Sequence, residues 1–201
     1  MKKFLFTSLL IAGSLRADLI PLLVQPGGIT PGATAGTFLF NYNVALDSTS
    51  KLTDASTSPF VQFFTVYDFF GFTGVTTAPS GWSFVADPGL TPPLTVPFDD
   101  PTLPNITFQY VGTGAISGPT TFTGFQIGSV VADTRLSAYS GQSTKQTADA
   151  ANTVQANVGQ TLTPLPGGGG VGNPVPEPMA MSLMGGGLSL LALLHRRIAK
   201  K

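Results

Sequence analysis

The chain has 201 residues, no cysteine, and ten acidic residues that are balanced by ten basic ones. The balance is uneven along the chain, because residues 18–178 contain all ten acids but only three cations and so carry a net charge of −7. An acidic region without clustered Lys or Arg excludes nucleic-acid binding. The absence of cysteine excludes disulfides, so the middle region, long enough for one ordinary core, has to fold by burial and hydrogen bonding alone.

The N-terminus has the pattern of a secretory signal peptide. Lys2 and Lys3 form a basic n-region, residues 4–13 form an apolar h-region, and Ala17 offers a small residue for cleavage before Asp18. Cleavage after Ser14 is an alternative, as is a buried N-terminal helix in place of a signal. We therefore expect a signal peptide over residues 1–17, read by the Sec translocon and by signal peptidase.

Period-two alternation dominates the middle of the chain. Residues 37–46 alternate an aromatic and aliphatic face with a more polar one, which predicts a half-buried strand. Residues 60–72 are apolar on both faces and predict a central strand that bends near Gly71. Further strands are predicted over residues 82–86, 105–111, 120–131, 135–139 and 154–162, with Pro- and Gly-containing breaks between them.

Short strands at regular spacing predict an all-β fold, an antiparallel β-sandwich over residues 18–163 whose jelly-roll or immunoglobulin-like topology is undetermined. A barrel is the main alternative. The one weak helical candidate is 147–158, which is Ala-rich. Residues 164–175, rich in Pro and Gly, are expected to form a linker.

The composition limits the chemistry that the folded region can perform. The only histidine is His195 and the only glutamate is Glu177, so residues 18–163 offer no imidazole, thiol or glutamate for Ser-His-Asp catalysis or for a zinc site. We therefore expect no enzyme, no catalytic residue, no metal site and no cofactor. Two alternatives stay open: an Asp–Asp hydrolase drawn from the set Asp68, Asp87, Asp99, Asp100 and Asp133, and a weak calcium site at Asp99 and Asp100.

Aspartates before proline usually bond their own backbone in turns, and Asp68, which interrupts an apolar run, is expected to mark a strand end or to face solvent. The aromatic residues of the region are similarly ambiguous, because they suit either the core or a sugar-stacking platform. At strand spacing the core is the more common role. The residues concerned are Tyr42, Tyr67, Trp82, Tyr110 and Tyr139.

The C-terminus has three parts in a fixed order. Pro176-Glu177-Pro178 comes first, an uncharged apolar stretch follows over residues 179–194, and a basic end closes the chain with Arg196, Arg197, Lys200 and Lys201. At roughly 1.5 Å per residue the apolar stretch would extend about 24 Å as a helix, somewhat less than a hydrocarbon core of ~30 Å. The basic end would stay on the cytoplasmic side as a stop-transfer signal.

This C-terminal pattern resembles the PEP-CTERM sorting signal of exported bacterial proteins, over residues 176–201. The resemblance implies an exopolysaccharide-producing Gram-negative setting and processing at the motif by an exosortase-type membrane enzyme. We expect an exported, non-enzymatic envelope or matrix protein, tethered to the inner membrane as a precursor and later located at the cell surface or outside. The alternatives are a secreted carbohydrate- or calcium-binding adhesion module that contacts extracellular polysaccharide, and an anchor that is never cleaved.

Overall fold

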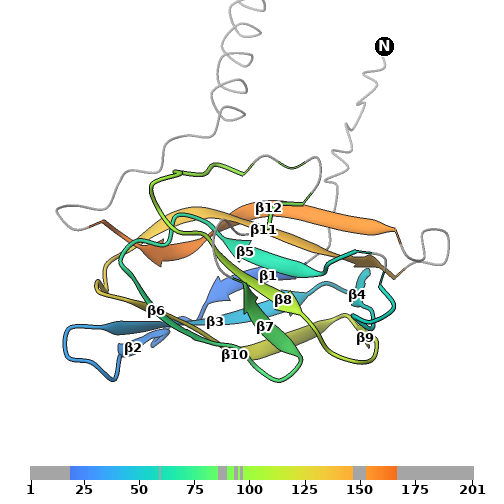
Figure 1. Ribbon diagram of the computed structural model, residues 1–201, viewed down its shortest axis with the longest axis horizontal. Coiled ribbons are helices and arrows are strands. Elements are labelled where there is room, and N and C mark those ends of the chain that lie inside the picture. The colour runs from blue at the N-terminus through green and yellow to red at the C-terminus, as the bar shows by residue number, and fades with distance from the viewer. Residues whose placement is uncertain are drawn as a thin grey trace, which may run out of the picture. The chain divides into compact units, whose positions relative to one another are not determined.

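The computed structural model describes residues 19–58, 60–85, 90–92, 95, 97–146 and 153–166 (Figure 1). The described residues form strands and loops without any helix, which confirms the all-β prediction. The strands are β1 (Leu19–Leu23), β2 (Ile29–Pro31), β3 (Phe38–Leu46), β4 (Ser50–Leu52), β5 (Phe63–Val66), β6 (Phe72–Thr77), β7 (Trp82–Val85), β8 (Ile106–Tyr110), β9 (Ile116–Ser117), β10 (Thr120–Ser129), β11 (Thr134–Lys145) and β12 (Val154–Pro164).

The first sheet is built around β3. Its strand order is β1–β3–β10–β6, every pair is antiparallel, and β2 pairs with β3 as well. β10 pairs along the whole of one edge of β3. The other edge of β3 is shared by β1 and β2, which pair with successive parts of it. The alternation of β3 decides which face is buried: Phe40, Tyr42, Val44 and Leu46 are almost fully buried, as the sequence pattern predicts.

The second sheet is built around β5 and β11. Its order is β7–β8–β5–β11–β4–β9, again antiparallel throughout, and β12 pairs with the remaining edge of β11 over its full length. β5 lies between β8 and β11 and is buried on both faces, which confirms the central strand expected there. Figure 1 shows β12, in orange, alongside β11.

One core of aromatic side chains joins the two sheets into sandwich-like layers. Phe64 of β5 stacks on Phe108 of β8, with ring centroids 5.2 Å apart, and meets Phe125 of the first sheet edge-on at 5.1 Å. Trp82 of β7 also contacts Phe125 edge-on, at 5.2 Å. Offset and edge-to-face contacts of this kind are the favoured geometries of aromatic pairs. The sandwich is therefore held together by rings contributed from both layers.

A β-bulge in β10 explains how that strand presents two aromatic residues of opposite parity to the core. Phe122 lies opposite Val44 and Phe125 lies opposite Tyr42, so β10 contains one residue more than β3 between these two pairs. Gly124 adopts φ +92° within the bulge, a conformation that glycine reaches without steric cost. The extra residue restores the inward direction of Phe125, which is fully buried.

Leu90 and Thr91 contact the outer face of the second sheet. The hydroxyl of Thr65 lies 2.8 Å from that of Thr107 and donates to the carbonyl of Leu90 at 2.6 Å. The hydroxyl of Tyr67 lies 2.9 Å from that of Ser140. These hydroxyl contacts reach β11 at Ser140, which is fully buried.

Two strand predictions were wrong in their extent, and the helical candidate was wrong over its second part. The expected strand 60–72 ends at Val66, and the chain turns at Asp68 before Phe72 begins β6 in the other sheet. The strand predicted to end at Tyr139 continues to Lys145. The helical candidate 147–158 is wrong from Val154 onward, where the chain is β12, and its first part, 147–152, lies outside the described residues.

The signal peptide 1–17, most of the linker 164–175 and the C-terminal segment 176–201 lie outside the described residues. Within the ranges that the structure does describe, no helix is long and apolar enough to cross a membrane.

Candidate functional site

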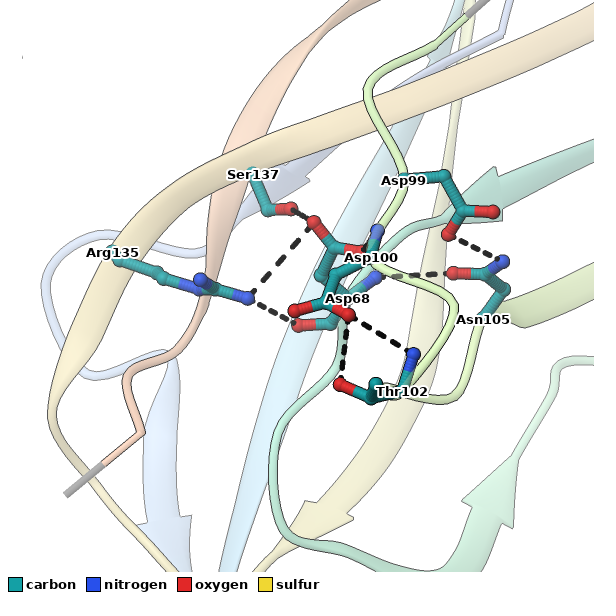
Figure 2. Close-up of polar contacts among 7 residues, drawn as sticks. All are labelled: Asp68, Asp99, Asp100, Thr102, Asn105, Arg135 and Ser137. Atoms are coloured by element: carbon teal, nitrogen blue, oxygen red, sulfur yellow. Dashed lines mark hydrogen bonds and ion pairs between the residues drawn. The ribbon is translucent and has the colours of Figure 1, made fainter. Parts of the chain in front are cut away.

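The sorting and processing residues predicted from the sequence all lie outside the described residues. They are Ala17 and Asp18 at the signal cleavage point, the motif Pro176, Glu177 and Pro178, and the basic residues Arg196, Arg197, Lys200 and Lys201. The structure instead brings together a set of polar residues around Asp68, drawn in Figure 2. We call this set the Asp68 cluster: Asp68, Asp99, Asp100, Thr102, Asn105, Arg135 and Ser137.

Asp68 lies where the chain leaves the second sheet. β5 ends at Val66, although the pairing with β11 continues for one more residue through the N–H of Tyr67, which donates to the carbonyl of Ala138 at 3.0 Å. Asp68 then adopts φ +56°. Aspartate tolerates this left-handed conformation better than most residues, and the turn directs the chain toward β6. The prediction that Asp68 marks a strand end is confirmed, but its side chain is buried and does not face solvent.

Every polar group of Asp68 has a partner. Its carboxylate oxygen Oδ1 accepts the backbone N–H of Asp100 at 2.7 Å, and Oδ2 accepts the hydroxyl of Ser137 at 3.2 Å (Figure 2). Arg135 donates from Nη2 to the Asp68 carbonyl at 3.1 Å, and the same nitrogen lies 4.0 Å from Oδ2. The backbone N–H of Asp68 donates to Asn105 Oδ1 at 3.1 Å. A buried carboxylate needs partners of this kind, because burial without them is costly.

The segment from Asp99 to Asn105 forms the other side of the cluster. Asn105 donates from its amide to Asp99 Oδ1 at 3.0 Å. Asp100 Oδ1 accepts both the backbone N–H of Thr102, at 3.0 Å, and its hydroxyl, at 2.7 Å. These two bonds close the turn that Asp100 and Pro101 were expected to form. Asp99 departs from that expectation, since its carboxylate accepts from a side chain six residues away.

Hydrogen bonding also shifts the pKa of Asp100, which is half-buried. The two hydrogen bonds from Thr102 lower the pKa of Asp100 below its ordinary value, and the positive charge of Arg135 acts in the same direction. In the polar layer beside the cluster, burial raises the pKa of Tyr67. By composition, the cluster has three aspartates and one arginine, so acidic side chains outnumber basic ones.

This arrangement is suited to holding three chain segments together. The contacts link the β5–β6 connection, the 99–105 loop and the start of β11, which are separated by up to 69 residues in the sequence. The oxygens of Asp68 are occupied by donors from the protein. Among the described residues no three acidic, His or Cys side chains are grouped so as to hold a metal ion. The weak calcium site kept as an alternative at Asp99 and Asp100 therefore gains no supporting geometry.

A surface pocket lies elsewhere, beside the end of β8. It has a volume of about 200 Å³ and is lined by Ala55, Ser58, Phe60, Val61, Gln62, Gln109 and Tyr110. None of these side chains is a carboxylate, so the pocket does not supply the pair of aspartates that a glycosidase needs.

The aromatic residues considered as a sugar-binding platform are part of the interior. Each is exposed by 7% or less, which confirms that they are buried: Tyr42, Tyr67, Trp82, Tyr110 and Tyr139. The hydroxyl of Tyr42 donates to the carbonyl of Leu162 at 2.6 Å, so even its polar end is occupied within the protein. The alternative in which these rings form a carbohydrate-binding platform is therefore wrong.

Sequence reasoning did not identify Asn105, Arg135 or Ser137 as partners of Asp68. Asn105 begins the sequence Asn-Ile-Thr, a formal glycosylation sequon, yet it is 6% exposed and its amide is used within the cluster. Arg135 carried a usable signal, because it is the only arginine between residues 18 and 178. A lone arginine in a strongly acidic region indicates an ion pair, but not which aspartate it meets.

Comparison with known proteins adds no assignment, since no family model, curated protein or solved structure matches the chain.

Proposed function

We propose that this is an exported, non-enzymatic protein of the cell envelope or extracellular matrix, delivered by its N-terminal signal peptide and sorted through a C-terminal signal at Pro176-Glu177-Pro178. The ordered succession of a Pro-Glu-Pro motif, an apolar stretch and a basic end carries the proposal. In this account the apolar stretch holds the precursor in the inner membrane, and an exosortase-type enzyme cleaves the chain near the motif. The two prolines keep the motif extended, and the carboxylate of Glu177 is the charge that the enzyme recognises.

The described domain supports a structural role in this account. Asp68 is the only charged side chain that is buried among the described residues, and the protein itself supplies the donors for its carboxylate. A catalytic carboxylate has to face a site that substrate and water reach. Asp68 instead fixes the chain where it passes between the sheets. The domain is accordingly a stable, acidic, disulfide-free module that the linker presents at the cell surface.

The proposal is tested by removing the recognition charge without altering the domain. We expect Glu177→Gln to accumulate as a membrane-bound precursor in a host that carries an exosortase-type enzyme, whereas the unaltered chain is released to the surface or medium. Asp133→Asn is the matched control, because Asp133 is exposed and lies in the folded domain. Release of Glu177→Gln at the same rate and size as the unaltered chain would show that the motif is not the sorting signal.

A further inference from the structure

The edge strand β12 shows an alternation opposite to that of an ordinary half-buried strand. Its even-numbered positions include Val154 and Val158, which are 38% and 44% exposed. Its odd-numbered positions include Asn157, Thr161 and Thr163, which are exposed by 6% or less. Strands of a sandwich normally turn their apolar side inward and their polar side outward. The first half of β12 thus exposes two valines and buries Asn157, whereas Leu162, which is also even-numbered, packs against the core.

The buried polar side of β12 does not account for this orientation. Four of its side-chain oxygens have no hydrogen-bond partner among the described residues: Gln155 Oε1, Asn157 Oδ1, Thr161 Oγ1 and Thr163 Oγ1. Unpaired buried oxygens cost free energy, and a slip of one residue in register would turn them outward and the valines inward. An outward side that serves as a contact surface would account for this register.

Among the described strands, the backbone of β12 is paired along one edge only. Among the described residues β12 is hydrogen-bonded as a strand to β11 alone. The carbonyl of Thr153 accepts the N–H of Lys145, so the odd-numbered residues point their backbone groups at β11 and the even-numbered ones point theirs at the open edge. The open edge ends where the hydroxyl of Tyr42 donates to the carbonyl of Leu162.

This edge lacks the features that prevent strands from pairing. Residues 154–163 contain no charged residue and no proline, and the strand has no bulge in its pairing with β11. Edge strands of monomeric proteins are usually protected by lysine, proline, bulges or short length. β12 has eleven residues and none of these protections before Pro164.

We propose that β12 is a self-association edge, at which β12 of one copy pairs antiparallel with β12 of a second copy. The occupant has to be an uncharged extended strand with apolar residues on its outward side, and β12 itself meets that description. Placing Ala156 opposite its own copy sets Val154 opposite Val158 on both sides of a two-fold axis. The four valines then form one apolar row across the pair. The inference concerns β12 alone and does not depend on how the chain is sorted.

A lysine on the edge tests the proposal directly. We expect the full chain, held in a mild detergent that keeps its apolar ends apart, to sediment as a dimer, and Val158→Lys to raise the dimer dissociation constant by about tenfold or more. Val111→Lys is the matched control: Val111 is 45% exposed, but it lies in the loop after β8. A monomeric wild-type chain, or a Val158→Lys variant that dimerises as tightly as Val111→Lys, would overturn the proposal.

Cysteine cross-linking provides a test that does not require a weakened interface. The chain has no cysteine, so Ala156→Cys introduces a single thiol at the proposed two-fold axis. Opposed residues of a hydrogen-bonded antiparallel pair have Cα atoms about 5.5 Å apart, within the range of a disulfide. We expect mild oxidation to produce a covalent dimer of Ala156→Cys and little of Val111→Cys. Equal cross-linking of the two variants would overturn the proposed pairing.

Discussion

Asp68 has two roles: its carboxylate accepts hydrogen bonds, and its backbone at positive φ forms the turn. Substitutions at this position separate the two. Asp68→Ala leaves the N–H of Asp100 and the hydroxyl of Ser137 without their acceptor. Hydrogen bonds to a charged group contribute roughly 1.5–3 kcal/mol each. The ion pair with Arg135 adds less than about 1 kcal/mol, because it spans 4.0 Å and the arginine is 29% exposed. We expect Asp68→Ala to lower the free energy of unfolding by about 4 kcal/mol.

The backbone contribution is isolated by comparing alanine with glycine. Alanine at φ +56° is strained, whereas glycine adopts this conformation freely, so Asp68→Gly should be more stable than Asp68→Ala by about 1 kcal/mol. Asp68→Asn keeps the turn and one acceptor, and should cost about 2 kcal/mol.

Urea unfolding of the full chain, followed by intrinsic fluorescence and circular dichroism, measures all three variants against the exposed control Asp133→Asn, which should stay within about 0.5 kcal/mol of the unaltered chain. If Asp68→Ala also stays within that margin, the cluster does not hold the three segments together. If alanine and glycine cost the same, the strain assigned to this turn is wrong.

Two further predictions follow from the acidic turn and from the contact between the sheets. The lowered pKa of Asp100 means that its contribution to stability is fully present above the unfolded-state pKa and is lost as the pH falls through the lower folded-state pKa. Urea midpoints measured across acidic pH should therefore fall less steeply for Asp100→Asn than for the unaltered chain, and parallel curves would contradict the assignment. Gly141→Ala should lower the free energy of unfolding by about 2 kcal/mol, because the added Cβ would lie 2.5 Å from the backbone carbonyl oxygen of Leu19. An unchanged urea midpoint would show that β1 does not pack so closely against β11.

The sequence predicts strands best where burial alone decides their pattern. β3 and β5 are clear in the sequence because one face of β3 packs against the core and β5 is buried on both faces. The short strands β1, β2, β4 and β9 give no such signal. β1 contains Pro21, which a strand accepts because β1 is an edge strand that pairs with β3 alone among the described strands.

Long-range contacts explain what the sequence does not predict. The second half of β11, rich in Ser, Gly and Gln, has no strand-like apolar face, and its burial comes partly from a segment that lies some fifty residues earlier, as the contact from Ser140 through Tyr67 to Thr91 shows. The Asp68 cluster is similar: its members come from three segments, and the chemical type of each residue is visible in the sequence while its partner is not. The sequence likewise does not predict which face of β12 is buried, because an alternating pattern defines two faces without showing which of them points inward.

The central claim is tested most directly by the intact mass of the protein recovered from the cell-surface and medium fractions. The account predicts a chain that has lost residues 1–17 and everything beyond the Pro176–Pro178 motif. A chain that keeps residues 179–201 in every fraction would contradict processing at the motif and leave a β-sandwich that is never released by cleavage.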